Sequence, residues 1–253
     1  MTSQESVVLD VVDGTVLVIT INRPAARNSI DAAVATGLLK AVERLDADPT
    51  LQVGVITGAG GFFSSGMDLK AFEQHGPPAD LMPFLTREGH KPTIAAVERF
   101  ALAGGLEVAL TCDMVVASEG SRFGVPEVSV GLFAAGGALC RLPRRMPISI
   151  ALEMALTAQP ITAENAQTHG LVNRIVPAGE ALEGALDLAR TIASHAPAAL
   201  QATRELMYQS LDLDESAFWG LQQPLIATVF GSDDAKEGPR AFAEKRPPNW
   251  TGK

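Results

Sequence analysis

Residues 101–108 read Ala101-Leu102-Ala103-Gly104-Gly105-Leu106-Glu107-Val108, and a related stretch, Phe62-Phe63-Ser64-Ser65-Gly66-Met67-Asp68-Leu69, occupies residues 62–69. In both stretches small residues lead directly into an expected helix, which leaves backbone N–H groups unpaired at a positive helix end. Two such groups that converge on one point would form an oxyanion hole. The alternative is that both stretches are ordinary turn-to-helix junctions.

Two glutamates in apolar surroundings favour a catalytic site over ordinary turn-to-helix junctions. Glu107 lies within Leu106–Leu110, and Glu127 lies within Phe123–Val128. An ionised carboxylate is costly to bury, so such groups often have a raised pKa and perform acid–base chemistry. If the two met in space, they could hold a water molecule between them and exchange its protons. The alternative is a buried structural glutamate that pairs with Arg122 or Arg141.

The composition limits the possible functions further. The 253 residues are enough for a large core, and 20 Lys+Arg against 29 Asp+Glu give a formal net charge of −9. This acidic balance argues against a nucleic-acid partner. The two cysteines, Cys112 and Cys140, do not form a disulfide framework, so we expect a reduced, cytoplasmic protein. No membrane association is expected, since Met1–Ser6 does not resemble a signal peptide and the apolar runs are shorter than the roughly 18–20 residues of a membrane span.

Hydrophobic periodicity predicts an α/β protein. Asp13-Gly14 between two β-branched runs indicates a hairpin, and Ser29 or Asp31 is expected to cap the helix that follows. The expected strands are Val7–Val12, Thr15–Ile21, Val53–Thr57, Pro92–Val97 and Met114–Ala117. The expected helices are Ala32–Ala47, Gly105–Thr111, Ile148–Thr157, Ala163–His169, Gly179–Ala193 and Pro197–Leu211. The four histidines lie in unrelated contexts, so we expect neither a metal site nor a Ser-His triad.

Taken in order, these segments resemble the enoyl-CoA hydratase/isomerase (crotonase) superfamily over nearly the whole chain. The matching stretches are Asn22-Arg23-Pro24, Arg27-Asn28, 63–69, 91–97, 103–107, Cys112-Asp113, 123–127, Gly170-Leu171-Val172 and 241–246. The resemblance implies a crotonase-like spiral of repeated ββα units over residues 1–195. It also implies a helical C-terminal region over 196–253 that forms homotrimers or dimers of trimers. The ligand would be an acyl-CoA thioester, with coenzyme A as part of the substrate and no separate metal or redox cofactor.

The same resemblance assigns roles in the reaction. The N–H groups of Met67 and Gly104 would bind the thioester oxygen. Glu107 would hold and deprotonate a water molecule, and Glu127 would give a proton to the α-carbon, which amounts to syn hydration of a trans-2-enoyl-CoA. The presence of both glutamates favours a hydratase, or the reverse dehydratase, over an isomerase. An enoyl-CoA isomerase, a carnitinyl-CoA-type dehydratase and a non-catalytic acyl-CoA-binding paralogue are the alternatives.

The resemblance also places coenzyme A. Arg27 would lie near its phosphates and Lys245 would approach coenzyme A, unless the two are simply solvated surface charges. Ser65, Asp68 and Leu69 belong to the stretch that would run past the adenine and pantetheine. Asp68 could equally cap a helix.

The sequence departs from the family pattern at two places. Ala135 stands where many hydratases have a glycine that lines the water site. Glu98-Arg99 replaces a common Asn-Gly pair before the second glycine stretch. These changes could alter water placement and the shape of the acyl pocket.

Overall fold

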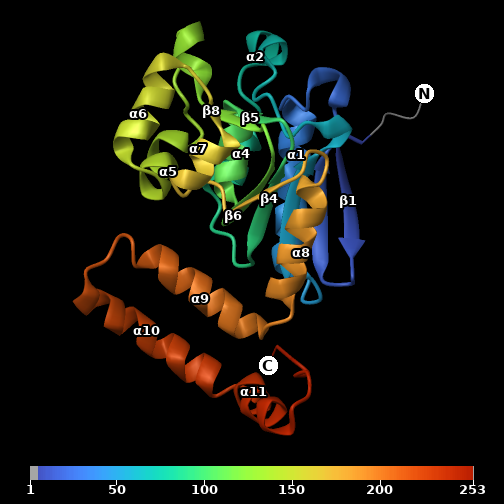
Figure 1. Ribbon diagram of the computed structural model, residues 1–253, viewed down its shortest axis with the longest axis vertical. Helices are drawn as coiled ribbons and strands as arrows, with labels where there is room; N and C mark the ends of the chain where they lie inside the picture. Colours follow the sequence, from blue (N-terminus) through green and yellow to red (C-terminus); the bar gives the residue numbers. More distant parts are fainter. Residues whose placement is uncertain (1–4, 253) are drawn as a thin grey trace.

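A six-stranded sheet in the order β1-β2-β3-β4-β6-β9 forms the centre of the structure, a computed structural model that describes residues 5–252 (Figure 1). The expectation drawn from Met1–Ser6 therefore falls mostly outside the described residues. The strands are β1 (Val7–Val12), β2 (Val16–Ile21), β3 (Val53–Gly58), β4 (Thr93–Val97), β6 (Met114–Ser118) and β9 (Arg174–Val176). Only β1 runs antiparallel to its neighbour. The α/β class is confirmed.

The first two strands form the predicted hairpin. Asp13 and Gly14 both have positive φ, 51° and 73°. The loop between the strands is Asp13-Gly14-Thr15, with Thr15 N donating to Val12 O at 3.2 Å across the two positive-φ residues, a conformation that Asp-Gly adopts at low cost. The turn sets the register, in which Val12 pairs with Val16 and Val7 with Ile21.

A smaller, three-stranded sheet lies beside the main one. It contains β5 (Phe100–Leu102), β7 (Arg122–Gly124) and β8 (Ile161–Thr162), and Ser64 pairs with Ala101 at its edge. The strands β3, β4 and β6 are thus each followed by a short extended segment, at Ser64, β5 and β7 respectively, that pairs in or at the edge of the second sheet. This repetition is the predicted spiral of ββα units.

Helices cover both faces of the main sheet. The helices of the core are α1 (Ala32–Ala47), α2 (Leu69–His75), α3 (Leu81–Thr86), α4 (Gly104–Thr111), α5 (Ala138–Arg145), α6 (Ile148–Thr157), α7 (Ala163–Thr168) and α8 (Ala181–Ala193), of which α1 and α8 pack on opposite faces of the main sheet. Alternate residues of β2 face opposite sides: Val16 and Val18 pack in the cluster that contains α8, whereas Leu17 and Ile19 pack with α1. Asp31, one of the two predicted caps, accepts a hydrogen bond from Val34 N at the start of α1.

The last three helices form an arm beneath the core, α9 (Pro197–Gln209), α10 (Glu215–Phe230) and α11 (Asp233–Glu244) (Figure 1). Asp113 anchors α9, since its Oδ1 accepts hydrogen bonds from Arg204 Nε and Tyr208 Oη, both at 2.8 Å. Large apolar side chains are exposed on and around the arm, namely Met207, Leu211, Trp219, Phe230 and Phe242. The boundary at 195/196 and the role of the arm in assembly stay predictions. None of the described helices is both long enough and apolar enough to cross a bilayer.

Candidate active site

Glu107 is held on α4, a helix of which residues 104–110 are all buried. Its side chain is also buried, with the residue only 6% exposed. Oε1 accepts hydrogen bonds from Gly136 N at 2.6 Å and from Ala138 N at 3.3 Å. Since Ala138 is the first residue of α5, the carboxylate lies at the positive end of that helix.

Opposing effects act on the ionisation of Glu107. Burial raises its pKa, while the N–H groups of Ala138 and Gly136 and the positive charge of Arg141 act in the other direction. The net shift is upward. Glu107 is therefore a buried carboxyl whose ionised form is stabilised by two directed donors, a suitable arrangement for a general base.

Glu127 lies in the short helix η3 (Pro126–Val130), directly after Pro126. Its Oε2 is buried and receives no hydrogen bond from any of residues 5–252. Burial raises the pKa of Glu127, and the negative charge of Glu107 raises it further, against a hydrogen bond from its own backbone amide. The two glutamates are therefore close enough to interact electrostatically, and the unpartnered oxygen is free to donate or accept a proton at a ligand.

The alternative of a structural ion pair with an arginine is wrong for both glutamates. The Arg141 guanidinium donates to backbone carbonyls, and no described salt bridge involves Glu107 or Glu127. Arg122 lies on β7, with its side chain directed into a separate cavity.

The two glycine-bearing stretches come together at Met67 and Gly104. A Cβ placed on Gly104 would lie 3.5 Å from Met67 N, and one placed on Gly66 would lie 3.1 Å from Gly104 N. Neither Met67 N nor Gly104 N donates a hydrogen bond to another described residue. Ala103, which lies between β5 and Gly104, has the strained angles φ 49° and ψ −130°. Two adjacent unpaired amides are what an oxyanion hole requires.

Gly66 is expected to be essential to this pair of amides. It has φ +98°, and a Cβ there would lie 2.7 Å from Ala103 Cβ and 2.9 Å from Leu102 O. Gly66→Ala should therefore destabilise the fold by about 1–3 kcal/mol through backbone strain. Because it also pushes Gly104 away from Met67, kcat should fall by about tenfold or more. Chemical denaturation and steady-state kinetics measure the two effects.

Gly14→Ala is the matched control for that change. Gly14 has φ +73° but no atom within 4 Å of its Cβ position. The Gly14→Ala variant should lose free energy of unfolding through backbone strain, without a loss of kcat. Equal loss of kcat in both variants would contradict a specific role for Gly66.

Most of the predicted coenzyme A residues cluster beside this pair. Ser65 N donates to Arg27 O at 3.1 Å, and Asp68 N donates to Ile30 O at 2.9 Å. Arg27 and Leu69 are exposed. The Asp68 carboxylate accepts from Ala71 N as the cap of α2 and pairs with Arg23 at 3.1 Å. The Asp68 side chain therefore caps a helix, the alternative role named for it above, and its backbone N–H and C=O are both paired within the chain.

Lys245 is the exception. It ends α11, at the opposite end of the molecule from α2, and its side chain is exposed (Figure 1). The structure does not bring it to the other candidate residues within one chain.

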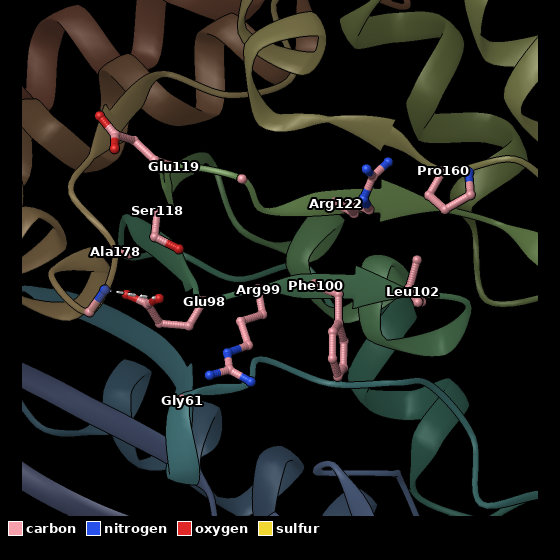
Figure 2. Close-up of a pocket in the computed structure, with 12 residues that line it drawn as sticks. Gly61, Glu98, Arg99, Phe100, Leu102, Ser118, Glu119, Arg122, Pro160 and Ala178 are labelled. Atoms are coloured by element: carbon pink, nitrogen blue, oxygen red, sulfur yellow. Dashed lines mark hydrogen bonds between the residues drawn. The ribbon is translucent and has the colours of Figure 1, made fainter.

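The unusual Glu98-Arg99 pair lies at a separate cavity of about 540 Å³ (Figure 2). The Glu98 carboxylate accepts from Gly179 N at 3.2 Å and from Ala181 N at 2.9 Å, which caps the start of α8. The Arg99 guanidinium stacks 5.0 Å from the centre of the Phe62 ring. This departure from the family pattern therefore serves packing around α8 and Phe62.

The other departure, Ala135, is exposed. The residues that contact Glu107 are neighbours of Ala135 in the sequence. Gly136 and Ala138 supply the amides that hold Glu107, and sequence reasoning missed both. The sequence signal that could have indicated these amides is the pair Gly136-Gly137 directly before a helix. Among residues 5–252, no group of three or more His, Cys, Asp or Glu could hold a metal ion.

Comparison with known proteins gives consistent matches over the whole chain. The family model of enoyl-CoA hydratase/isomerase matches residues 12–253. Enoyl-CoA hydratase EchA19 of Mycobacterium tuberculosis is 41% identical over 94% of this chain and 93% of its own length. Carnitinyl-CoA dehydratase of Salmonella typhi is 39% identical over 95% of this chain and 97% of its own. The crystal structure of an enoyl-CoA hydratase from Mycobacterium tuberculosis H37Rv superposes with a TM-score of 0.94, at 45% identity, over 99% of this chain and 100% of that one.

Proposed function

This chain belongs to the enoyl-CoA hydratase/isomerase family, and we propose that it is a hydro-lyase that adds water to a trans-2-enoyl-CoA thioester. The observation that carries the proposal is the buried carboxyl of Glu107 and the half-buried carboxyl of Glu127, whose Oε2 is buried, beside the unpaired amides of Met67 and Gly104. A protein that only bound acyl-CoA would have no use for two desolvated acids.

In the proposed reaction, the N–H groups of Met67 and Gly104 bind the thioester oxygen and stabilise the charge that develops there. Glu107 takes a proton from water, whose oxygen bonds to the β-carbon. Glu127 gives its proton to the α-carbon. Return of a proton from Glu107 to Glu127 closes the cycle, and the reverse sequence is dehydration.

The assignment of base and acid follows from the two environments. Two amides and the Arg141 charge favour the ionised form of Glu107. Glu127 has an unpartnered oxygen and a negative neighbour, which favour its protonated form. Two carboxyls whose surroundings differ in this way divide the acid and base roles.

Coenzyme A would lie along residues 65–69, with Arg27 near its phosphates. Lys245 would then reach the coenzyme A of a neighbouring subunit, because α11 lies far from α2 in its own chain. This supports assembly as a homotrimer or a dimer of trimers, as does the exposed apolar surface of the arm. We place the reaction in the cytoplasm, with no cofactor beyond the coenzyme A of the substrate.

Incubation with crotonyl-CoA tests the proposal, with loss of the conjugated enoyl absorbance as the measurement. Turnover is expected. Binding without turnover would contradict it and favour a non-catalytic paralogue.

The similarity to carnitinyl-CoA dehydratase supports a second candidate substrate, a branched or carnitine-like acyl-CoA. The same two glutamates would then work in the direction of water loss. A comparison of kcat/KM for crotonyl-CoA and for an enoyl-CoA that carries a trimethylammonium group separates the two.

A further inference from the structure

The Arg141 side chain on α5 binds two backbone carbonyls and no carboxylate among the described residues. Nη1 donates to Gly136 O at 3.1 Å, and Nη2 donates to Leu85 O at 2.5 Å. Burial lowers the pKa of Arg141, and the positive charge of Arg145 lowers it further. A guanidinium fork is well suited to connect two acceptors in fixed geometry.

One of these two acceptors belongs to the residue that holds Glu107. Gly136 donates its N–H to Glu107 Oε1 at 2.6 Å while its carbonyl accepts from Arg141. The other acceptor residue packs against the same glycine, since a Cβ placed on Gly136 would lie 2.6 Å from Leu85 Cδ1. Arg141 therefore connects the end of α3 to the loop that carries the Glu107 donor.

We propose that Arg141 is a positioning residue for Glu107: it fixes the Gly136 loop so that the amide of Gly136 meets the carboxylate. This inference rests on the proposed hydratase function. Arg141 touches neither substrate nor reacting atoms in this role, and acts through Gly136.

Few groups set the ionisation of Glu107. Arg141 faces it from α5 and Glu127 from η3, and the amides of Gly136 and Ala138 donate to it. Loss of Arg141 removes a positive charge and loosens one amide, and both changes favour the protonated carboxyl. The titration of Glu107 should then move to higher pH.

Arg145 offers a matched control one helical turn further along α5. It is also partly buried, and it donates from Nη2 to Leu110 O and Cys112 O without touching Gly136. Arg141→Met and Arg145→Met therefore each remove a guanidinium that binds two carbonyls, and only the first affects the Glu107 loop.

Two measurements on the full-length protein decide the role. The infrared band of the protonated carboxyl that Glu107→Gln abolishes reports the titration of Glu107 without any turnover. It should shift to higher pH in Arg141→Met, stay in place in Arg145→Met, and shift less in Arg141→Lys, which keeps the charge but loses the fork. In hydration of crotonyl-CoA, kcat should fall by about tenfold or more in Arg141→Met, with little change in KM, as for other supports of a catalytic group.

A third comparison tests whether Arg141 acts through Glu107. In the Glu107→Gln background, Arg141→Met should cost little further rate. An unshifted infrared band in Arg141→Met, the same shift in both Met variants, or an equal loss of rate with and without Glu107 would overturn the role. Absence of turnover in the unsubstituted protein would instead overturn the proposed function, and the infrared titration would still decide the role of Arg141.

Discussion

Glu107→Gln and Glu127→Gln are each expected to lower kcat for hydration of crotonyl-CoA by at least about 10²-fold, the scale of a positioned acid–base group. Gln preserves the shape of each side chain and its place in the core, so the loss measures the proton chemistry. At position 107 the amides of Gly136 and Ala138 can still donate to the amide oxygen, but no base remains. At position 127 no carboxylic acid remains to protonate the α-carbon.

Glu119→Gln serves as the control, because Glu119 is an exposed glutamate away from this pair. It should leave kcat unchanged. The two active-site changes should combine non-additively, since one reaction cycle uses both groups. Survival of double-bond isomerisation of a 3-enoyl-CoA in Glu107→Gln but not in Glu127→Gln would favour the single-base isomerase over the hydratase.

The pH dependence follows from the directions of the two shifts. Hydration needs Glu107 ionised, so the rate falls as the pH drops through its pKa, which lies above the ordinary value of 4.5. Hydration also needs Glu127 protonated, so the rate falls again as the pH rises through its raised pKa. The profile of kcat/KM should be bell-shaped, with limbs that belong to the interacting pair.

Local signals in the sequence predicted much of the fold. Asp13-Gly14 predicted the hairpin because the two residues that adopt positive φ in its turn are adjacent in the sequence. The helix expected over Ala32–Ala47 has those bounds in the structure, because its periodicity and its Asp31 cap agree. The strands β5, β7 and β8 have only two or three residues each, so no period is visible, and their pairing depends on residues far along the chain.

The active site was likewise predictable only in part from the sequence. Glu107 and Glu127 were recognisable because a carboxylate in an apolar segment is conspicuous. Gly136 and Arg141 were not, because their roles lie in backbone contacts across a gap of 29 residues to Glu107 and 56 residues to Leu85. Lys245 matches a family pattern, but the placement of its helix depends on assembly, which a single chain does not specify.

Gly136→Ala is the second change with a large expected effect. A Cβ at this position would lie 2.7 Å from the carboxyl carbon of Glu107 and 2.6 Å from Leu85 Cδ1. The added methyl must displace the carboxylate or the loop, and a misplacement of about 1 Å can cost about 10²-fold in rate. We expect a fall in kcat of that order with KM little changed, measured with crotonyl-CoA.

The pH profile distinguishes displacement of the base from general damage to the fold. If the methyl pushes Glu107 off the amides of Gly136 and Ala138, the carboxyl keeps its burial and loses the donors that oppose it. Its pKa then rises, so the acidic limb should move to higher pH while thermal unfolding remains a single transition. In the Glu107→Gln background the same methyl should cost little further activity, because no base is left to misplace. A comparable loss in that background, or an unmoved acidic limb, would show that Gly136 supports the fold in general and does not specifically hold the base.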